Sequence, residues 1–279
     1  MNRQVYYRSV KSKQKSLQVA CKVVSMIKAI RLRMPRIGGK KLYKILYINL
    51  NELDVGRDKL FAIMKANHLQ IRPKRQYHVT TNSHHRFKKH KNLIENLLIH
   101  KPEQVFVSDI TYIGTRAYPM YLALVTDAYS KKIMGFNVSN NLTTAGAFAA
   151  MTMAIKNRFY HHADLIHHSD KGLQYCSNEY QELLIGNNIS CSMTEKYDPY
   201  QNAVAERVNG ILKQEFLEGI SIKDLQLMRL LVAESIDIYN TERPHYSNYY
   251  ETPQQMHNQS KIKMRTYKSK IASQKCDAI

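Results

Sequence analysis

The sequence predicts a mixed α/β core that follows a basic helical module. Beyond about residue 104, β-branched and aromatic runs of strand length come first and then alternate with helix-like segments. Before that point, apolar residues recur at intervals of three and four among many Lys and Arg, as they do in helices. The chain has 279 residues, of which 44% are hydrophobic. This length allows roughly two domains and a sizeable hydrophobic core.

The front of the chain is predicted to be helical. Apolar spacing indicates helices over 16–34 and 39–51, interrupted by Pro35 and Gly38, and a third helix over 60–69 after the turn at 55–58. Short helices with tight turns and many basic residues favour a helix-turn-helix-like module, with an ordinary helical bundle as the alternative. We expect this module to span residues 1–75 and a polar, basic linker to span 76–101.

The core is expected to span residues 102–258, ahead of a basic tail at 259–279. Its first three strands are joined by turns too short for parallel crossovers, so a doubly wound sheet is excluded. Thr143 or Thr144 is expected to cap the first core helix. In chain order, the expected elements are strands 104–113, 118–126 and 132–138, helix 143–159, strand 164–168, helix 179–185, strand 189–193, and helices 203–217 and 225–239.

The net charge of +20 is unevenly distributed along the chain. Residues 1–103 hold 24 Lys and Arg against 5 Asp and Glu, whereas residues 104–259 hold 12 against 16. A basic block of this size favours nucleic-acid binding; a solvated face or an anionic membrane surface is the alternative. No apolar run approaches 18 residues, the four cysteines are far apart, and no signal peptide is evident. These features predict a cytoplasmic protein that is not inserted into a membrane.

Three acidic residues stand out in the acidic core. Asp109 lies inside a predicted strand, Asp170 follows another strand, and Glu206 lies on a predicted helix. Each acid has an ordinary explanation when taken alone. Asp109 could be a hydrogen-bonding strand residue, Asp170 a turn former before Gly172, and Glu206 a solvated helix residue. Together, three converging carboxylates would repel one another and would require a hard cation such as Mg²⁺ or Mn²⁺. Two such ions can support an in-line phosphoryl displacement.

The motifs around these acids resemble those of a known family. In order, the chain contains V-S-D-I-T-Y-I, L-V-T-D-A-Y-S-K-K-I-M-G, H-H-S-D-K-G-L-Q-Y, D-P-Y-Q-N-A-V-A-E-R-V-N-G-I-L-K-Q-E and Y-N-T-E-R-P-H. This set resembles the catalytic, second-frame product of transposases of the insertion-sequence-three family, which is similar to retroviral integrases. The resemblance covers roughly residues 38–257. Phe106 stands near a position where family members often carry Trp, and the chain has no Trp.

The resemblance implies a ribonuclease-H-like integrase core in which the first and fourth strands are neighbours. Asp109, Asp170 and Glu206 would then be the catalytic carboxylates and would hold two Mg²⁺ ions, with Mn²⁺ as a substitute. His167 and His168 lie in the same motif, and we interpret them as structural or supporting residues, because hard ions prefer oxygen ligands. Asp127 is shared with the family but lies in a hairpin turn, so we interpret it as structural.

Several further residues are predicted to contact DNA. Lys213 follows Glu206 by seven residues, which places both on one helix face, and a basic residue there contacts DNA in the family. For Asn202, helix capping and substrate contact are both open. Gln201 stands where the family often has an acid, which leaves a role for its side chain in doubt. The remaining predicted contacts are Arg207, Lys40, Lys41, Arg57, Lys74 and Arg75.

The resemblance implies an enzyme that cleaves and joins DNA strands at insertion-sequence ends. Its expected partners are double-stranded DNA, both terminal inverted repeats and target, an upstream-frame protein or fusion that supplies a helix-turn-helix and a zipper, and further copies of itself. One alternative is a non-catalytic DNA-binding regulatory product that acts only with its upstream frame. A plain nuclease of the same fold is another. The presence of all three acids favours the enzyme.

Overall fold

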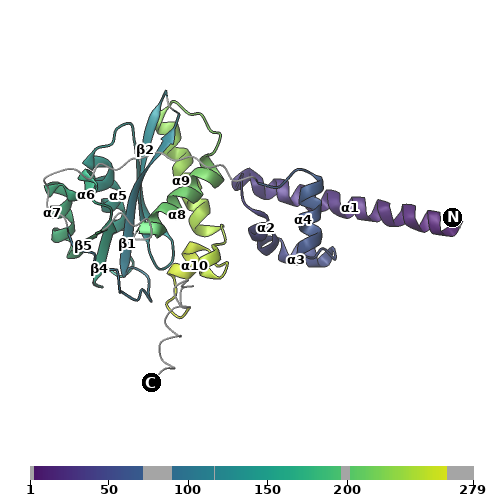
Figure 1. Cartoon of the computed structure of the whole chain (residues 1–279), viewed down its shortest axis with the longest axis horizontal. Coiled ribbons are helices and arrows are strands. Elements are labelled where there is room, and N and C mark those ends of the chain that lie inside the picture. Colours follow the sequence, from purple (N-terminus) through teal and green to yellow (C-terminus); the bar gives the residue numbers. More distant parts are fainter. Residues whose placement is uncertain (1–2, 72–89, 116, 196–201, 263–279) are drawn as a thin grey trace, which may run out of the picture. The chain divides into compact units, whose positions relative to one another are not determined.

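The computed structural model describes residues 3–71, 90–115, 117–195 and 202–262 (Figure 1). The chain forms two compact units, one of Met1–Gln76 together with Gln214–Phe216 and one of Tyr77–Lys213 together with Leu217–Ile279. No helix in the described ranges combines the length and the apolar composition that crossing a membrane requires.

The first unit contains the predicted helices, with different bounds. They are α1 (Arg3–Arg33), α2 (Gly39–Ile45), α3 (Tyr47–Glu52) and α4 (Arg57–Ala66). The expected start of α1 at residue 16 is wrong, because the helix begins at Arg3. The residues before 16 contain no helix breaker, so the helix continues through them. They have no buried apolar face, so the sequence pattern did not indicate a helix there. The helix expected over 39–51 is divided at Leu46, whose backbone leaves helical geometry.

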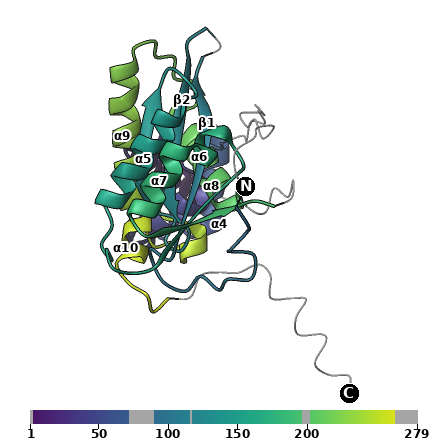
Figure 2. The same ribbon diagram turned by 90° about the vertical axis from the view of Figure 1, so that its left-hand side faces the viewer.

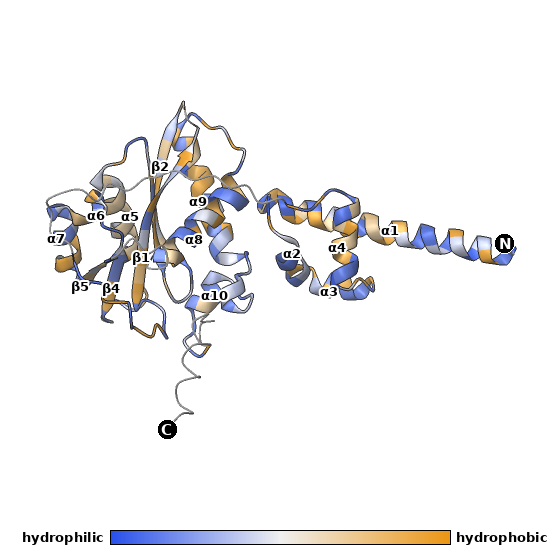
Figure 3. Cartoon of the chain, viewed as in Figure 1, coloured by the Kyte–Doolittle hydropathy of each residue, from blue (hydrophilic) through white to orange (hydrophobic). Residues whose placement is uncertain are grey.

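The core of this unit uses only part of α1. Val23 and Ile27 are fully buried, whereas residues 3–18 of the same helix are exposed apart from a partly buried Val10. The other buried apolar residues of the unit are Met34, Ile37, Leu42, Leu46, Leu50, Val55, Leu60, Met64 and Phe216. Blue, hydrophilic segments predominate in the outer part of α1 (Figure 3). The amino-terminal half of α1 is therefore not held by this core.

The second unit is built on a mixed five-stranded sheet, as predicted. Its strands are β1 (Val105–Gly114), β2 (Pro119–Asp127), β3 (Ile133–Ser139), β4 (Leu165–Ser169) and β5 (Ile189–Met193), in the order β3-β2-β1-β4-β5. The β1–β2 and β2–β3 pairs are antiparallel, whereas the β1–β4 and β4–β5 pairs are parallel. The first and fourth strands are thus neighbours, as the family resemblance implied.

Helices cover both faces of this sheet. Figure 2 shows α5 (Thr144–Lys156), α6 (Leu173–Cys176) and α7 (Asn178–Gly186) in front of the strands. Helices α8 (Ala203–Ile211) and α9 (Leu225–Thr241) lie on the other side of β1 and β2 in Figure 1. The 3₁₀ turn Tyr246–Asn248 and α10 (Pro253–His257) follow. Neither α6 nor α10 was predicted, because each has only one turn or slightly more and leaves little periodicity.

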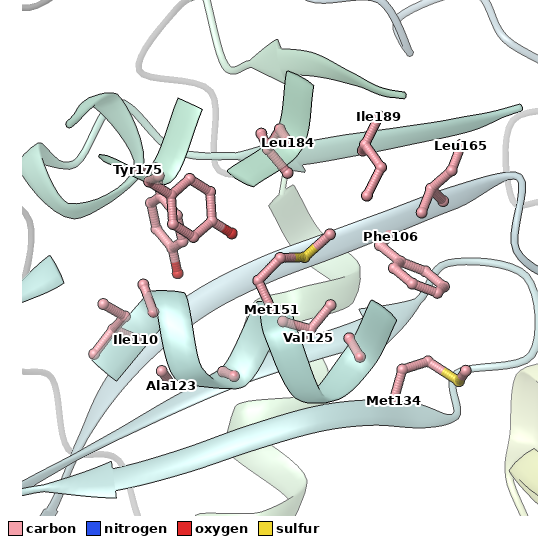
Figure 4. Close-up of a cluster of buried hydrophobic side chains, with 14 of the residues drawn as sticks. Phe106, Ile110, Ala123, Val125, Met134, Met151, Leu165, Tyr175, Leu184 and Ile189 are labelled. Atoms are coloured by element: carbon pink, nitrogen blue, oxygen red, sulfur yellow. The ribbon is translucent and has the colours of Figure 1, made fainter. Parts of the chain in front are cut away.

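The alternation of β1 between the two faces explains where Asp109 points. Phe106 and Ile110 belong to the apolar cluster shared with α5, α6 and α7 (Figure 4). Val105 and Val107 instead pack with Ala205 of α8. Because successive strand side chains face opposite ways, Asp109 shares the α8 face with the two valines.

Helix boundaries in the core differ from the expectation. The helix expected over 143–159 ends at Lys156, and the N–H groups of Phe159 and Tyr160 bond Glu103 instead of continuing it. The helix predicted over 203–217 is α-helical only to Ile211, after which Leu212–Leu217 forms a π-helix. Such a change leaves the apolar spacing nearly unaltered, so the sequence pattern does not reveal it. Thr143 occupies the capping position of α5, but its side chain makes no capping bond.

Candidate active site

The three predicted acids reach one region from three different elements. Asp109 lies in the middle of β1, Asp170 directly follows β4, and Glu206 lies in the first half of α8. The parallel pairing of β1 with β4 runs from Val105 to Val107 and leads the two strands toward Asp109 and Asp170. The order of the sheet therefore brings together two acids that are far apart in the sequence.

Electrostatics connect the three carboxylates. Burial, the charge of Asp170 and the charge of Glu206 raise the pKa of Asp109 to about 7, against the opposing effect of a hydrogen bond from Asn209. Burial and Asp170 also raise the pKa of Glu206. Each shift has the direction expected when carboxylates share a confined region without a compensating cation.

The turn after β4 holds Asp170 through the adjacent glycine. The backbone N–H of Gly172 donates to Oδ1 of Asp170 at 3.0 Å. A Cβ atom on Gly172 would lie 2.9 Å from that same oxygen. The absence of a side chain at Gly172 is therefore what allows the carboxylate of Asp170 to adopt this position.

Lys213 lies in the π-helix that continues α8. Burial lowers the pKa of its ammonium group, while the charges of Glu218 and Asp109 act in the opposite direction. Lys213 is thus within electrostatic range of Asp109 and is only partly buried. Its expected contact with DNA beside the acids stays a prediction.

Two asparagines of α8 contact β1 on either side of Glu206. Nδ2 of Asn202 donates to the backbone oxygen of Ser108 at 3.0 Å. Nδ2 of Asn209 donates to Oδ2 of Asp109 at 2.8 Å. Asn202 occupies the capping position of α8, but its side chain makes no capping bond and contacts β1 instead.

Sequence reasoning missed Asn209 altogether. A signal was present, because Asn209 follows Glu206 by three residues and Asn202 by seven, the spacings of one helix face. Ala205 and Val208, between Asn202 and Asn209 in the sequence, are buried. Polar residues beside such apolar ones on a helix indicate a polar contact in the core.

The histidines of the H-H-S-D motif contact other side chains. Nε2 of His167 lies 2.8 Å from Oγ of Ser108 and 3.1 Å from Oη of Tyr180. Burial and the neighbouring His168 lower the pKa of His167 to about 3, which keeps this imidazole neutral. Nδ1 of His168 lies 2.8 Å from Oγ of Ser192. These contacts agree with a structural or supporting role.

Asp127 occupies a second buried polar cluster, at the end of β2, where it pairs with Phe106 near the start of β1. Its Oδ1 accepts from the backbone N–H of Glu103, and its Oδ2 accepts from Ser130. His257 of α10 lies within 3.4 Å of Asp127 and 3.3 Å of Glu103. Every one of these contacts anchors a turn or a helix, in agreement with the structural interpretation of Asp127.

The predicted DNA contacts are in varied environments. Lys40, Arg57 and Arg207 are exposed. Arg57 bonds Asp58 at 2.9 Å, and Lys41 bonds Glu215 at 2.6 Å within the first unit. Lys74, Arg75 and Gln201 lie outside the described residues.

The donor chemistry of the three acids suits a hard divalent cation. They present carboxylate oxygens, which Mg²⁺ and Mn²⁺ prefer, and they raise one another's pKa values as uncompensated anions do. Among the residues that the structure describes, no three His, Cys, Asp or Glu side chains already stand close enough to hold a metal ion. The three acids therefore fit a divalent cation through their charge and their type of ligand atom.

Sequence comparisons identify the core and its relatives. Two family models described as integrase core domain match residues 99–199 and 187–253. The 31 kDa protein of insertion element IS600 from Shigella sonnei is 34% identical over 70% of this chain and 72% of its own length. Transposase InsF for insertion sequence IS3fB from Escherichia coli K12 is 31% identical over 71% of this chain and 69% of its own length. A Mycobacterium tuberculosis relative from IS986/IS6110 is matched over 53% of its length.

A solved structure supports the fold. The chain aligns with a simian T-cell lymphotropic virus intasome, with a TM-score of 0.50 and 16% identity, over 83% of this chain and 79% of the other. This likeness concerns the fold, which is that of the ribonuclease-H-like integrase cores. With the integrase-core matches and the transposase relatives, it leads to one assignment: the chain belongs to the insertion-sequence-three family of transposases, polynucleotidyl transferases that act in insertion-sequence transposition.

Proposed function

We propose that Asp109, Asp170 and Glu206 are the catalytic carboxylates of this transposase and that they hold two Mg²⁺ ions, for which Mn²⁺ can substitute. The observation that carries the proposal is the pairing of the neighbouring strands β1 and β4, because Asp109 lies on β1 and Asp170 directly follows β4. In support, burial and the charges of Asp170 and Glu206 raise the pKa of Asp109 to about 7. A strand carboxylate facing two more acids is costly to keep unless a cation offsets the repulsion.

The reaction is phosphodiester cleavage followed by transfer of the DNA 3′ end to a new strand. Divalent ions held by Asp109, Asp170 and Glu206 would supply the activation of water or a 3′-hydroxyl and the stabilisation of the leaving 3′-oxygen. Gly172 and Asn209 orient the carboxylates of Asp170 and Asp109. The ammonium group of Lys213, near Asp109, contacts a phosphate of the DNA. No protein nucleophile takes part, so no covalent enzyme intermediate forms.

The partner is double-stranded DNA, at the terminal inverted repeats and at the target. The first unit supports this, because α1 carries nine Lys and Arg and no Asp or Glu. Exposed Lys40 and Arg57 add to the basic surface, and Lys74 and Arg75 follow in the sequence. The simian viral relative is an intasome, and we propose that this chain also acts as an oligomer, in the cytoplasm, with an upstream-frame protein or fusion.

Strand cleavage and joining on a labelled duplex that carries the element's own end tests this function. We would assay the chain with and without its upstream frame in Mg²⁺, Mn²⁺ and EDTA, beside an Asp109→Asn variant. Joined product that requires metal and disappears in the variant is the expected result. Equal cleavage by wild type and Asp109→Asn would contradict the assignment of the acids.

The same assay decides on the second candidate function. A non-catalytic regulatory protein would bind the duplex yet give no cleaved or joined product, either with or without the upstream frame. The three acids favour the enzyme, since a protein that only binds DNA gains nothing from a carboxylate that raises its neighbours' pKa values and repels phosphate.

A further inference from the structure

The contact between α8 and β1 is built from amide groups on both sides of Glu206. Asn202 and Asn209 are seven residues apart, which is two helical turns, and they bond the consecutive residues Ser108 and Asp109. Between them, the small side chain of Ala205 packs against Val105 and Val107 and lets the helix approach the strand closely. The helix that carries Glu206 is therefore fixed in register with the strand that carries Asp109.

The two amide groups are buried and incompletely bonded. Asn202 is 6% exposed and Asn209 is 3% exposed. Within the described part of the chain, neither side-chain oxygen has a hydrogen-bond partner. Exchanging the amide oxygen and nitrogen of Asn209 would place its oxygen against the Asp109 carboxylate, so the donor must face the acid. A buried acceptor left without a partner costs stability, and its retention calls for an explanation.

Because the proposed function makes Asp109 a catalytic carboxylate, this contact has a meaning for the reaction. We propose that Asn209 is a positioning residue that orients the Asp109 carboxylate for the cation, while Asn202 keeps the Glu206 helix in register. The bond from Asn209 engages Oδ2 of Asp109 and so fixes the rotation of the carboxylate group. Groups that orient a metal ligand in this way commonly affect metal affinity by about 10- to 100-fold.

Tyr180 and His167 support the same segment of β1 from the opposite face. Oη of Tyr180 and Oγ of Ser108 both lie within 3.1 Å of Nε2 of His167. Ser108 is therefore held through its side chain on one face of the sheet and through its backbone oxygen by Asn202 on the other. With Ser108 fixed, the bond from Asn209, together with one from the backbone N–H of Ile110, defines the direction of the Asp109 side chain.

The first test is a double-mutant cycle in EDTA, with the full chain. Urea midpoints would be measured for wild type, Asn209→Ala, Asp109→Ala and the double variant. We expect Asn209→Ala to lower the midpoint of the wild type and to lower that of the Asp109→Ala background by less than half as much. An equal loss in both backgrounds would mean that Asn209 only stabilises α8 and would overturn the proposal.

The second test measures the metal concentration required for half-maximal cleavage. Asn209→Ala should raise it by about tenfold or more, while the affinity for the duplex in EDTA stays within about twofold. Asn240→Ala is the matched control, because Asn240 is also buried, at 9% exposure, but its amide bonds Ile133 away from the acids. This control should lose stability without changing the metal requirement. An unchanged requirement in Asn209→Ala would also overturn the proposal.

The outcome for Asp109→Asn separates this inference from the proposed function. If Asp109→Asn cleaves as well as wild type, the assignment of the acids fails, whatever Asn209 does. If Asp109→Asn is inactive but Asn209→Ala keeps the wild-type metal requirement and shows no coupling, only the positioning role fails.

Discussion

Gly172 controls the position of a proposed catalytic carboxylate without contributing a side chain. Its φ angle of −66° is open to any residue, so backbone strain does not require glycine there. The available space does require glycine, because a Cβ atom at residue 172 would lie 2.9 Å from Oδ1 of Asp170 and 3.1 Å from Oε1 of Gln174. Both atoms end flexible side chains, which can move aside at little cost in stability.

We therefore expect Gly172→Ala to separate activity from stability. The substitution should displace the Asp170 carboxylate and reduce strand cleavage by at least about tenfold, since small misplacements of reacting groups are costly. The free energy of unfolding should change by less than about 1 kcal/mol. Gly186→Ala is a suitable control, because a Cβ atom at Gly186 meets nothing within 4 Å. Wild-type cleavage by Gly172→Ala would show that Asp170 tolerates the displacement.

The raised pKa of Asp109 predicts a pH-dependent loss of stability in the protein without metal. The value of about 7 in the folded state exceeds the ordinary aspartate value of 3.8. Folding therefore favours the protonated form, and stability decreases as the pH rises from about 4 to 7. In EDTA at about pH 8, Asp109→Asn should be more stable than wild type by up to about 4 kcal/mol, with no such gain near about pH 4. Thermal melts of both proteins across this range measure the effect, and a gain that is independent of pH would contradict it.

At the scale of single elements, α4 ends in a way that predicts a stabilising substitution. His68 adopts a φ angle of 54° after the helix. Its N–H bonds the oxygen of Lys65, and the next N–H bonds the oxygen of Met64, the pattern of a Schellman motif. Glycine is favoured at this position because left-handed geometry costs other residues about 1–2 kcal/mol.

Replacing His68 with glycine should stabilise the first unit by about 0.5–1 kcal/mol, after the entropy cost of glycine is subtracted. Urea unfolding followed by helical circular dichroism measures the change. Lys65→Gly, inside the last turn of the same helix, is the control and should be destabilising by a similar amount. A loss of stability in His68→Gly would show that the histidine side chain contributes more than its backbone strain costs.

Helix α10 is fastened to the sheet through a charged histidine. Burial lowers the pKa of His257, but the hydrogen bonds to Asp127 and Glu103 outweigh it, and the pKa is raised. Three further cations face this cluster. Arg158 bonds Glu103 at 3.4 Å, the charge of Lys132 lowers the pKa of His257, and the buried Lys131 interacts with Asp127. The pKa of His257 in the folded state exceeds its unfolded value of about 6.5. The charged histidine therefore contributes its full stabilisation of the fold below about pH 6.5. It disappears as the pH rises through the folded-state value.

His257→Gln tests this attachment. Wild type should be more stable than the variant by about 1.5–3 kcal/mol near about pH 6, because hydrogen bonds to charged groups are of that size. The difference should shrink as the pH rises through the folded-state pKa of His257, above which the histidine is neutral. Thermal melts of both proteins at several pH values measure it. A difference that stays constant with pH would assign the role of His257 to packing alone.

The elements that could be predicted are those with strong periodicity. The β5 strand has its predicted bounds, and β1 to β4 differ from the expectation by a residue at either end. The π-helix at Leu212–Leu217 could not be predicted, because it changes the hydrogen bonding without changing composition. Among the site residues, the acids were found through their motifs. Asn209 was not. Its spacing from Glu206 places it on the same helix face, but only the packing of α8 against β1 shows that this side chain meets Asp109.

At the scale of the whole molecule, charge is divided along the chain. The basic residues that attract phosphate gather in residues 1–103, whereas the proposed catalytic acids lie in a segment with more Asp and Glu than Lys and Arg. Nearly all of the electrostatic attraction to DNA should therefore come from the front of the chain. The acids can then remain clustered for chemistry without having to provide binding energy.

The exposed basic side chains of α1 are where this attraction can be measured. Arg8, Lys11, Lys15 and Lys22 recur at intervals of three, four and seven, which places them along one helix face. Replacing Arg8, Lys15 and Lys22 with alanine should weaken binding to any duplex. It should also make the slope of log K for binding against log salt concentration shallower by about 2–3, because each lost phosphate contact contributes about 0.9 to that slope. Fluorescence anisotropy at several salt concentrations measures both quantities. Lys156→Ala, at the end of α5, removes one charge in the core and should leave the slope unchanged. If the triple variant keeps the wild-type slope, these three side chains do not contact phosphates and the attraction comes from other basic residues in the front of the chain.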